Sequence, residues 1–155
     1  MDVADGSLHA PASMEKALLD LLAKRKQPVP ADRGGLVRCV LESLALEYSR
    51  RLNSVAELAG PRSSLYMVGG GVKNTLLCQL TADACGIPVY AGADQCTALG
   101  NALGQALALG VLKSRHEICQ VMCDSFSMTM YTPRDQALWA EKRKKYAEVV
   151  LSSEV

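Results

Sequence analysis

The sequence predicts an α/β fold in which parallel strands are flanked by helices. Short apolar runs at residues 65–68 and 89–91 are each followed by a glycine-containing turn and then by a stretch with helical periodicity. A strand–helix–strand order favours parallel pairing through a right-handed crossover. Hydrophobic residues make up 49% of the chain and charged residues 21%, so there is enough apolar material for a packed core.

Composition and charge exclude several classes of protein. The formal net charge of +1 argues against a nucleic-acid-binding protein, which usually carries a basic stripe. The one dense basic run, Lys142–Lys145, is interpreted as the solvated face of a helix. No apolar run reaches the roughly 20 residues that cross a bilayer, and Met1–Asp5 lacks the features of a signal peptide. We therefore expect a cytoplasmic protein whose partners are neither nucleic acid nor membrane.

The cysteines, most of which lie within apolar segments, are expected to be buried, reduced thiols. There are six: Cys39, Cys78, Cys85, Cys96, Cys119 and Cys123. Their even number is compatible with disulfides, but no secretion signal is visible and none has the CxxC spacing of a metal or redox site. Cys119 and Cys123 are four residues apart and would share a face if this segment were helical, yet His116 is the only imidazole nearby, so no metal site is predicted.

Two helices are expected before the first strand. Residues 1–30 form an approach segment containing a helix at 14–23, with Met14, Leu18, Leu21 and Leu22 on its apolar side. A long helix follows near 36–59, with Asp32 as its N-cap and Gly60 as its stop signal. Its apolar stripe consists of Val37, Val40, Leu41, Leu44, Tyr48, Leu52 and Val55.

The middle of the chain reads as strand, turn, helix, strand, loop and helix. The run at 65–68 is continuously apolar, as expected of a strand buried on both faces. Helices are predicted at 74–85, with Leu76, Leu77, Leu80 and Ala84 facing inward, and at 97–109. The second strand covers 89–91, and a loop at 92–95 follows it.

The last third of the chain is less regular. Residues 111–133 show one alternating segment, Ser127–Tyr131, which is interpreted as an edge strand, and a helix with a charged outer face is expected at 136–151. Two secure strands are few for a doubly wound sheet. Either the C-terminal third supplies the others, or they belong to polypeptide outside this sequence.

The candidate ligand site is the turn formed by Gly69, Gly70 and Gly71. Glycines after a strand let the backbone turn sharply and let a ligand approach it, and the positive end of the next helix favours an anion there. The turn is no Walker A loop, and Asn74 stands where a Rossmann fingerprint has its third glycine. The alternative is a tight strand–helix junction with Asn74 as a helix N-cap.

Two further glycines lie inside the helix predicted at 97–109. Gly100 and Gly104 are one turn apart, and each costs about 1 kcal/mol of helix stability relative to alanine. Close packing of another helix is the favoured explanation. Close approach of a ligand is the alternative.

Three segments resemble the FGGY carbohydrate kinases, and among these the rhamnulokinases most closely. They are Val68–Val89, which includes the glycine turn, Thr97–Ala102, and the upstream helix Leu36–Tyr48. The resemblance covers roughly residues 5–135 and implies part of an actin-like ATPase, ribonuclease-H-like domain. It divides the chain into an approach segment (1–30), a nucleotide-binding domain of the C-terminal FGGY type (31–135) and a C-terminal helix (136–155).

The resemblance also implies where ligands bind. The backbone of Gly69, Gly70 and Gly71 would lie against ATP or ADP, and Asn74 would hydrogen-bond near the base or ribose. Mg²⁺ would arrive with the nucleotide and neutralise charge during phosphoryl transfer. In the family, glutamate often precedes the Thr97–Ala102 run. Gln95 occupies that place here, which removes a charge.

No catalytic residue is expected in this chain. The family's catalytic aspartate and its sugar-binding lobe precede the matched region, and none of Asp83, Asp94, Asp124 or Asp135 takes the aspartate's place. The resemblance thus implies the nucleotide-binding portion of a sugar kinase, inactive alone and able to act on a ketose only with the N-terminal lobe. The alternatives are a truncated, non-enzymatic paralogue that acts through a partner chain, and a different actin-like ATPase or dinucleotide enzyme.

Overall fold

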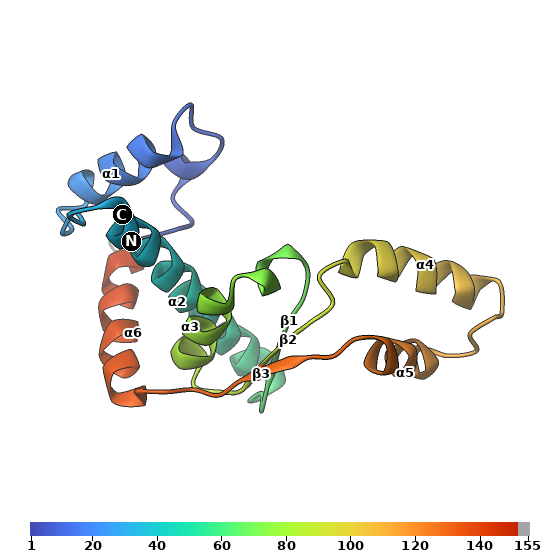
Figure 1. Ribbon diagram of the computed structural model, residues 1–155. Helices are drawn as coiled ribbons and strands as arrows, with labels where there is room; N and C mark the ends of the chain where they lie inside the picture. Colours follow the sequence, from blue (N-terminus) through green and yellow to red (C-terminus); the bar gives the residue numbers. More distant parts are fainter. Residues whose placement is uncertain (152–155) are drawn as a thin grey trace.

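The computed structural model describes residues 1–151 and contains a small sheet with helices around it (Figure 1). The helices are α1 (Met14–Lys24), α2 (Arg33–Ala59), α3 (Thr75–Cys85), α4 (Cys96–Ala108), α5 (Arg115–Ser125) and α6 (Gln136–Leu151). The strands are β1 (Leu65–Met67), β2 (Val89–Ala91) and β3 (Thr129–Tyr131). Two short 3₁₀ turns, η1 (Gly6–Leu8) and η2 (Gly70–Lys73), complete the list.

The sheet has the strand order β1-β2-β3. β1 and β2 are parallel, with Tyr66 opposite Tyr90, which confirms the predicted pairing. β3 lies antiparallel on the other edge of β2, with Met130 opposite Tyr90. The predicted edge strand near Ser127–Tyr131 is therefore present, but it makes the sheet mixed. The C-terminal third supplies one strand and no more within residues 1–151.

One face of this sheet is open, so the prediction of a strand buried on both faces is wrong for β1. Val89 and Ala91 of β2 are buried, and α3 contacts both β2 and β3. Tyr66 is 60% exposed, and its ring stacks on that of Tyr90 with centroids 5.2 Å apart. A short apolar run cannot distinguish a strand covered on both sides from one whose second face awaits a partner.

The core lies where α2, α3 and α6 meet. Leu46 of α2, Leu80 of α3 and Trp139 of α6 are buried in one cluster with Ala45, Ala84, Tyr146 and Val150. A second cluster holds α1 against the start of α2 through Leu18, Leu21, Leu22 and Leu36. The inward residues predicted for α1 are confirmed except for Met14, which is exposed.

The long helix α2 buries a different face from the one predicted. Ala45, Leu46 and Ser49 are buried, whereas Val37, Tyr48 and Val55 of the predicted stripe are exposed. Small side chains at the buried positions let α3 approach closely. Leu76 of α3, also predicted to face inward, is exposed as well.

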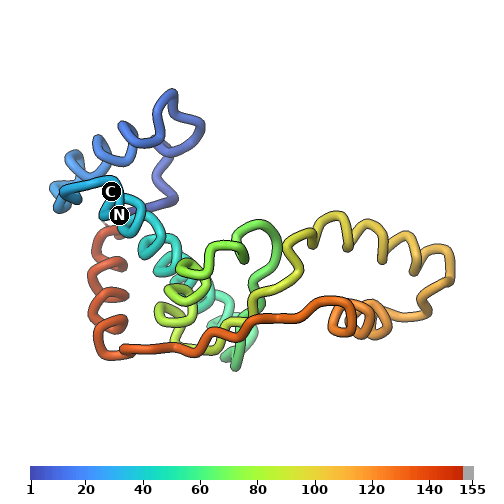
Figure 2. Tube along the Cα trace, in the orientation of Figure 1, coloured from blue at the N-terminus to red at the C-terminus, as the bar shows by residue number. Residues whose placement is uncertain are grey.

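Helices α4 and α5 extend away from the sheet as a hairpin. The chain leaves β2, runs outward along α4 and returns through α5 to β3 (Figure 2). Neither helix has a buried residue. A Cβ placed on Gly100 or Gly104 would meet nothing within 4 Å, so the close packing expected at these glycines is not present in the described residues.

Helix α5 was not among the helices predicted from the sequence, although the sequence contains a signal for it. The hydroxyl of Ser114 accepts a hydrogen bond from the backbone N–H of Glu117. The Glu117 carboxylate in turn accepts one from the N–H of Lys113 at 2.8 Å. Serine followed three residues later by glutamate is the usual signature of a helix start.

The basic run in α6 is only partly solvated, which corrects the sequence-based interpretation. Lys142 forms an ion pair with Glu42 at 2.7 Å and lies over the Trp139 ring. Arg143 donates to the carbonyl oxygen of Ala84 at 2.8 Å. Two of the four basic residues therefore hold α6 against α2 and α3.

The six cysteines are all free thiols, but the expectation that they are buried holds only for Cys78. Cys39, Cys85 and Cys96 are half-buried, and Cys119 and Cys123 on α5 are exposed. No helix within residues 1–151 combines the length and apolarity needed to cross a membrane.

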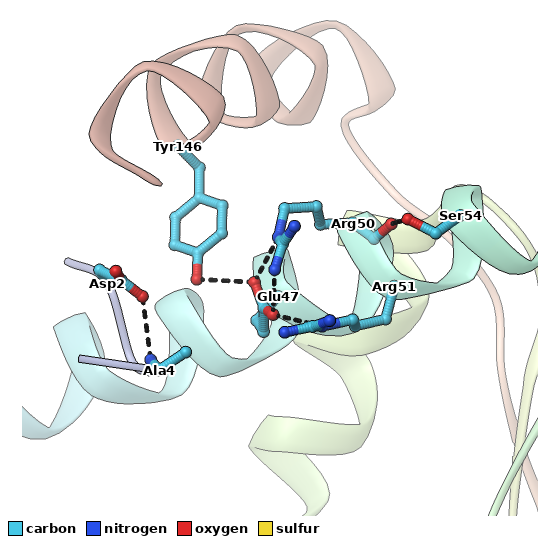
Figure 3. Close-up of polar contacts among 7 residues, drawn as sticks. All are labelled: Asp2, Ala4, Glu47, Arg50, Arg51, Ser54 and Tyr146. Atoms are coloured by element: carbon cyan, nitrogen blue, oxygen red, sulfur yellow. Dashed lines mark hydrogen bonds and ion pairs between the residues drawn. The ribbon is translucent and has the colours of Figure 1, made fainter. Parts of the chain in front are cut away.

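A buried carboxylate joins α2 to α6 (Figure 3). Glu47 accepts two hydrogen bonds from Arg50, each of 2.8 Å, and one from Arg51 of 2.7 Å. The Tyr146 hydroxyl donates to the same carboxylate at 3.1 Å. Burial opposes the charge on Glu47, but the hydrogen bonds from Arg50 and Arg51 outweigh it and the pKa of Glu47 is lowered. Burial and the Glu47 charge raise the pKa of Tyr146.

We expect Glu47 to make stability depend on pH. Its lowered pKa means that its contribution is fully present above its ordinary value of 4.5 and is lost as pH falls through the folded-state value. Glu47→Gln should lower the free energy of unfolding by about 1–3 kcal/mol at pH 7. In this variant the free energy of unfolding should also fall less steeply as the pH drops below 4.5. Urea unfolding at a series of pH values measures both effects. Glu57→Gln, an exposed change on the same helix, is the control. An unchanged acid profile in Glu47→Gln would contradict the assignment.

Candidate glycine-turn site

The candidate site begins where β1 ends. Gly69 has φ +83° and ψ −169°, a conformation open almost only to glycine. Its N–H donates to the carbonyl oxygen of Ala93 at 3.0 Å, and the N–H of Gly92 donates to that of Met67 at 3.1 Å. These two bonds continue the β1–β2 pairing beyond the strands. They hold the glycine turn next to the loop that follows β2.

The next two glycines present bare backbone to the outside. Gly70 and Gly71 are exposed, and a Cβ added at either would meet nothing within 4 Å. They open the 3₁₀ turn η2, which ends at Lys73. The protein's own side chains therefore do not fill the space over this turn.

Asn74 is the N-cap of α3. Its side-chain oxygen accepts a hydrogen bond from the Leu77 N–H at 3.0 Å, which matches the structural alternative for this residue. The same side chain is exposed, so its amide nitrogen is the atom with which it could donate to a ligand. The 3₁₀ turn η2 occupies Gly70–Lys73, and α3 begins at Thr75, within one residue of the start predicted from the sequence.

A charged pair spans the two loops at this edge of the sheet. Lys73 of η2 forms an ion pair of 2.8 Å with Asp94 in the loop after β2. The Lys73 ammonium lowers the pKa of Asp94, and the carboxylate raises that of Lys73. This pair was not predicted from the sequence. Parallel pairing places both loops at one edge, so a lysine and an aspartate just after the two strands were a usable signal.

Gly92 is needed because two segments approach each other closely. A Cβ at this position would lie 2.9 Å from Cγ of Met128 and 3.3 Å from the carbonyl oxygen of Ser127. The segment leading into β3 therefore packs directly on the loop after β2. Gln95, the position at which the resemblance implied a lost charge, is the N-cap of α4 and makes no capping hydrogen bond with its side chain.

A groove of about 770 Å³ runs from the turn along β1. We call it the β1–α2 groove. It is lined by residues of α2, of β1 and the residues beside it, of the glycine turn and of α3. Its lining residues are Tyr48, Arg51, Leu52, Val55, Arg62, Ser64, Leu65, Tyr66, Met67, Val68, Gly71 and Leu77.

Two of the aspartates that were set aside as catalytic candidates have structural partners: Asp94 pairs with Lys73 at the turn, and Asp83 lies near the far end of α3. Asp83 is buried and accepts hydrogen bonds from Gln79 and from the backbone N–H of Arg134, each of 2.8 Å. It thereby fixes the loop before α6. Among residues 1–151 no three His, Cys, Asp or Glu side chains are grouped so that they could hold a metal ion.

Residues 2–109 match the FGGY family of carbohydrate kinases, C-terminal domain. The chain belongs to this family. The matched stretch runs through α4 and contains the glycine turn, the Lys73–Asp94 pair and every lining residue of the β1–α2 groove. The family predicted from Val68–Val89 and Thr97–Ala102 is thus confirmed.

Relatives of the FGGY chain include rhamnulokinases. One from Bacteroides thetaiotaomicron is 42% identical over 136 residues, which cover 87% of this chain and 28% of the relative. One from Klebsiella pneumoniae is 43% identical over 134 residues, 86% of this chain and 28% of the relative. The chain therefore spans less than a third of the length of these relatives.

A solved structure shares the fold. The crystal structure of xylulose kinase from Rhodospirillum rubrum superimposes with a TM-score of 0.65 at 17% sequence identity. The match covers 81% of this chain and 26% of that one. The small mixed sheet and its helices are therefore a fold that recurs as part of a larger kinase.

We predict that the glycines of the turn serve different purposes. Gly69→Ala should destabilise the chain by about 1–3 kcal/mol, because φ +83° strains any residue with a Cβ. Gly70→Ala should change stability by less than about 0.5 kcal/mol, since its Cβ would enter open space. Thermal unfolding followed by circular dichroism compares the two. Equal losses would contradict the distinction between a backbone requirement and a surface requirement.

Proposed function

We propose that this FGGY chain is the nucleotide-binding C-terminal portion of an ATP-dependent sugar kinase of the rhamnulokinase type. In such a kinase the γ-phosphoryl group of ATP passes to a hydroxyl of a ketose. The observation that carries the proposal is the bare backbone of Gly70 and Gly71 at the carboxyl end of β1, open to solvent and beside Asn74.

The turn suits a nucleotide for three physical reasons. Backbone without side chains lets a flat base or a ribose come within van der Waals distance. The carboxyl ends of parallel strands are where open α/β sheets bind their ligands. The Asn74 amide and the Lys73 ammonium supply donors at the same edge. Gly69 belongs to this site because its conformation directs the two exposed glycines outward.

The rest of the reaction machinery lies outside this chain in our proposal. The ketose would be held by the N-terminal lobe, which also supplies the catalytic aspartate, and Mg²⁺ would enter with ATP. The fold is then one part of an actin-like, ribonuclease-H-like ATPase in the cytoplasm. Residues 31–135 form the nucleotide-binding domain, between the approach segment 1–30 and the C-terminal helix 136–155. The chain alone is accordingly inactive as a kinase.

One alternative follows from the share of the relatives that the chain covers. A polypeptide spanning 28% of a rhamnulokinase could be a non-enzymatic paralogue that acts through a partner chain. The loss of charge at Gln95 favours this alternative. A measurement of nucleotide binding distinguishes the kinase portion from the paralogue, because a paralogue that has lost the site would not bind ATP.

We expect the isolated chain to release or absorb heat with Mg–ATP and with Mg–ADP in titration calorimetry. Gly70→Val should reduce the affinity at least tenfold, since a branched side chain would occupy the space over the turn. Gly104→Ala is the matched control, because it also adds a Cβ in open space but lies on α4. Absence of binding in the unaltered chain, or equal binding by Gly70→Val, would count against the site.

Kinase activity should appear only in a complete molecule. The stretch of the Bacteroides thetaiotaomicron rhamnulokinase that this chain matches can be replaced by the chain itself. We expect this chimera to phosphorylate rhamnulose in a coupled ADP assay, and Gly70→Val within it to raise the KM for ATP. The chain alone is the negative control. A folded chimera without turnover on a panel of ketoses would contradict the kinase assignment.

A further inference from the structure

A pocket of about 400 Å³ lies where α2, α6 and the turn after α1 meet, near both ends of the chain (Figure 1). We call it the α2–α6 pocket. Its volume is within the range of about 300–1,000 Å³ that small-molecule sites usually have. It shares no lining residue with the β1–α2 groove, and neither the glycine turn nor Asn74 lines it. A ligand in this pocket is therefore held apart from the candidate nucleotide site.

The lining of the α2–α6 pocket carries more positive than negative charge. Arg38, Lys142 and Lys145 belong to it, and Glu42 is its one carboxylate among the described residues. Glu42 pairs with Arg38 at 2.6 Å and with Lys142 at 2.7 Å. One carboxylate cannot neutralise two cations, and Lys145 forms no ion pair within residues 1–151. The surplus of positive charge is one that an anion would balance.

Gln27 supplies a hydrogen-bond acceptor that the described chain leaves unsatisfied. Its side-chain Oε1 is buried and has no partner among residues 1–151. Most buried polar atoms are hydrogen-bonded, because a buried acceptor without a donor costs free energy. Gln27 also lines the α2–α6 pocket. A hydroxyl group of a ligand could therefore donate to Oε1.

Between these polar groups the wall of the pocket is apolar. Leu46 of α2 and Val149 of α6 line it together with Tyr146. Apolar walls with a few polar groups are typical of sites for small organic molecules. They would contact the carbon skeleton of a ligand whose anionic group lies at the lysines. An inorganic ion would leave both this wall and Gln27 without a contact.

We propose that the α2–α6 pocket binds a phosphate monoester of a polyhydroxylated compound, such as a sugar phosphate. Arg38, Lys142 and Lys145 hold the phosphate group, and a ligand hydroxyl donates to Oε1 of Gln27. Arg38 can take part because it donates only its Nε to Glu42, and a guanidinium has further N–H groups. Phosphate is favoured over a carboxylate because it has more acceptor oxygens for the cationic side chains.

The part of the pocket that α6 supplies lies outside the stretch that matches the family. Residues 2–109 match, whereas Lys142 and Lys145 follow them. The family match therefore does not account for this site. Binding of a sugar phosphate here depends on neither nucleotide binding nor kinase activity, because the residues assigned to the glycine turn do not line the pocket.

Titration calorimetry of the isolated chain with glucose 6-phosphate tests the proposal. The buffer contains no phosphate and little salt, because salt screens exposed charges. Glucose 6-phosphate should bind at least tenfold more tightly than inorganic phosphate, and glucose should give no measurable heat. Absence of binding would overturn the proposal. Equal affinity for glucose 6-phosphate and inorganic phosphate would also overturn it, since that result indicates an adventitious ion only.

A pair of lysine variants tests the position of the phosphate group. Lys145→Gln should lower the affinity for glucose 6-phosphate about fivefold, because it removes a cation from the lining. Lys144→Gln makes the same change at an exposed neighbour outside the lining and should bind like the unaltered chain. Circular dichroism of each variant checks that the fold is kept. Equal losses in the two variants would mean a general charge effect and would contradict a site in this pocket.

Gln27→Leu tests the hydroxyl contact. It should lower the affinity for glucose 6-phosphate and leave that for inorganic phosphate unchanged, a difference that a merely structural effect would not produce. Gln105→Leu, the same substitution at an exposed residue of α4, is the control. An equal loss for both ligands in Gln27→Leu would argue against the contact.

Gly70→Val separates this pocket from the candidate nucleotide site. The variant should bind glucose 6-phosphate normally, because Gly70 does not line the α2–α6 pocket. Loss of binding in Gly70→Val together with normal binding in Lys145→Gln would put the sugar phosphate at the glycine turn and overturn the proposal. Failure of this pocket and failure of nucleotide binding are therefore measured separately.

Discussion

The geometry of the candidate site depends on two backbone hydrogen bonds beyond the ends of β1 and β2. They join Gly69 to Ala93 and Gly92 to Met67. The first needs a residue that tolerates φ +83°, and the second needs a position without a Cβ, because the segment at Met128 lies against it. With both bonds formed, the two loops lie at one edge of the sheet. The exposed glycines and the Lys73–Asp94 pair follow from that arrangement.

Helix α3 supports the glycine turn, because it contacts η2 as well as the sheet, α2 and α6. Asn74 caps the helix at the end nearest the turn, and Asp83 binds the loop before α6 near the other end. Glu47 then connects α2 to α6 through Tyr146. A rigid support of this kind keeps an exposed loop in one geometry. The helices that support the candidate site, α2, α3 and α6, are packed against one another, whereas α4 and α5 have no buried residue.

Several surfaces of the described residues are open to solvent. The Tyr66 side of the sheet, the groove along α2 and the whole α4–α5 hairpin lack partners among residues 1–151. Each is apolar or carries glycines at a cost in helix stability. The chain spans 28% of the length of its Bacteroides thetaiotaomicron rhamnulokinase relative. Val55 and Gly104, for which the sequence predicted packed surroundings, are exposed among the described residues.

Local physical chemistry made several features predictable from the sequence. The strand at 89–91, the helix at 136–151, the parallel pairing and the glycine turn were identified because turn residues and hydrophobic period are local properties. The family could also be predicted from local sequence, in particular from Val68–Val89 and Thr97–Ala102. The tertiary structure alone decided which face of α2 is buried, that β3 is antiparallel, that Lys73 meets Asp94, and that the space over Gly70 is open. These depend on which segments come together in space, and an apolar stripe shows that a helix has a face to bury without showing what will cover it.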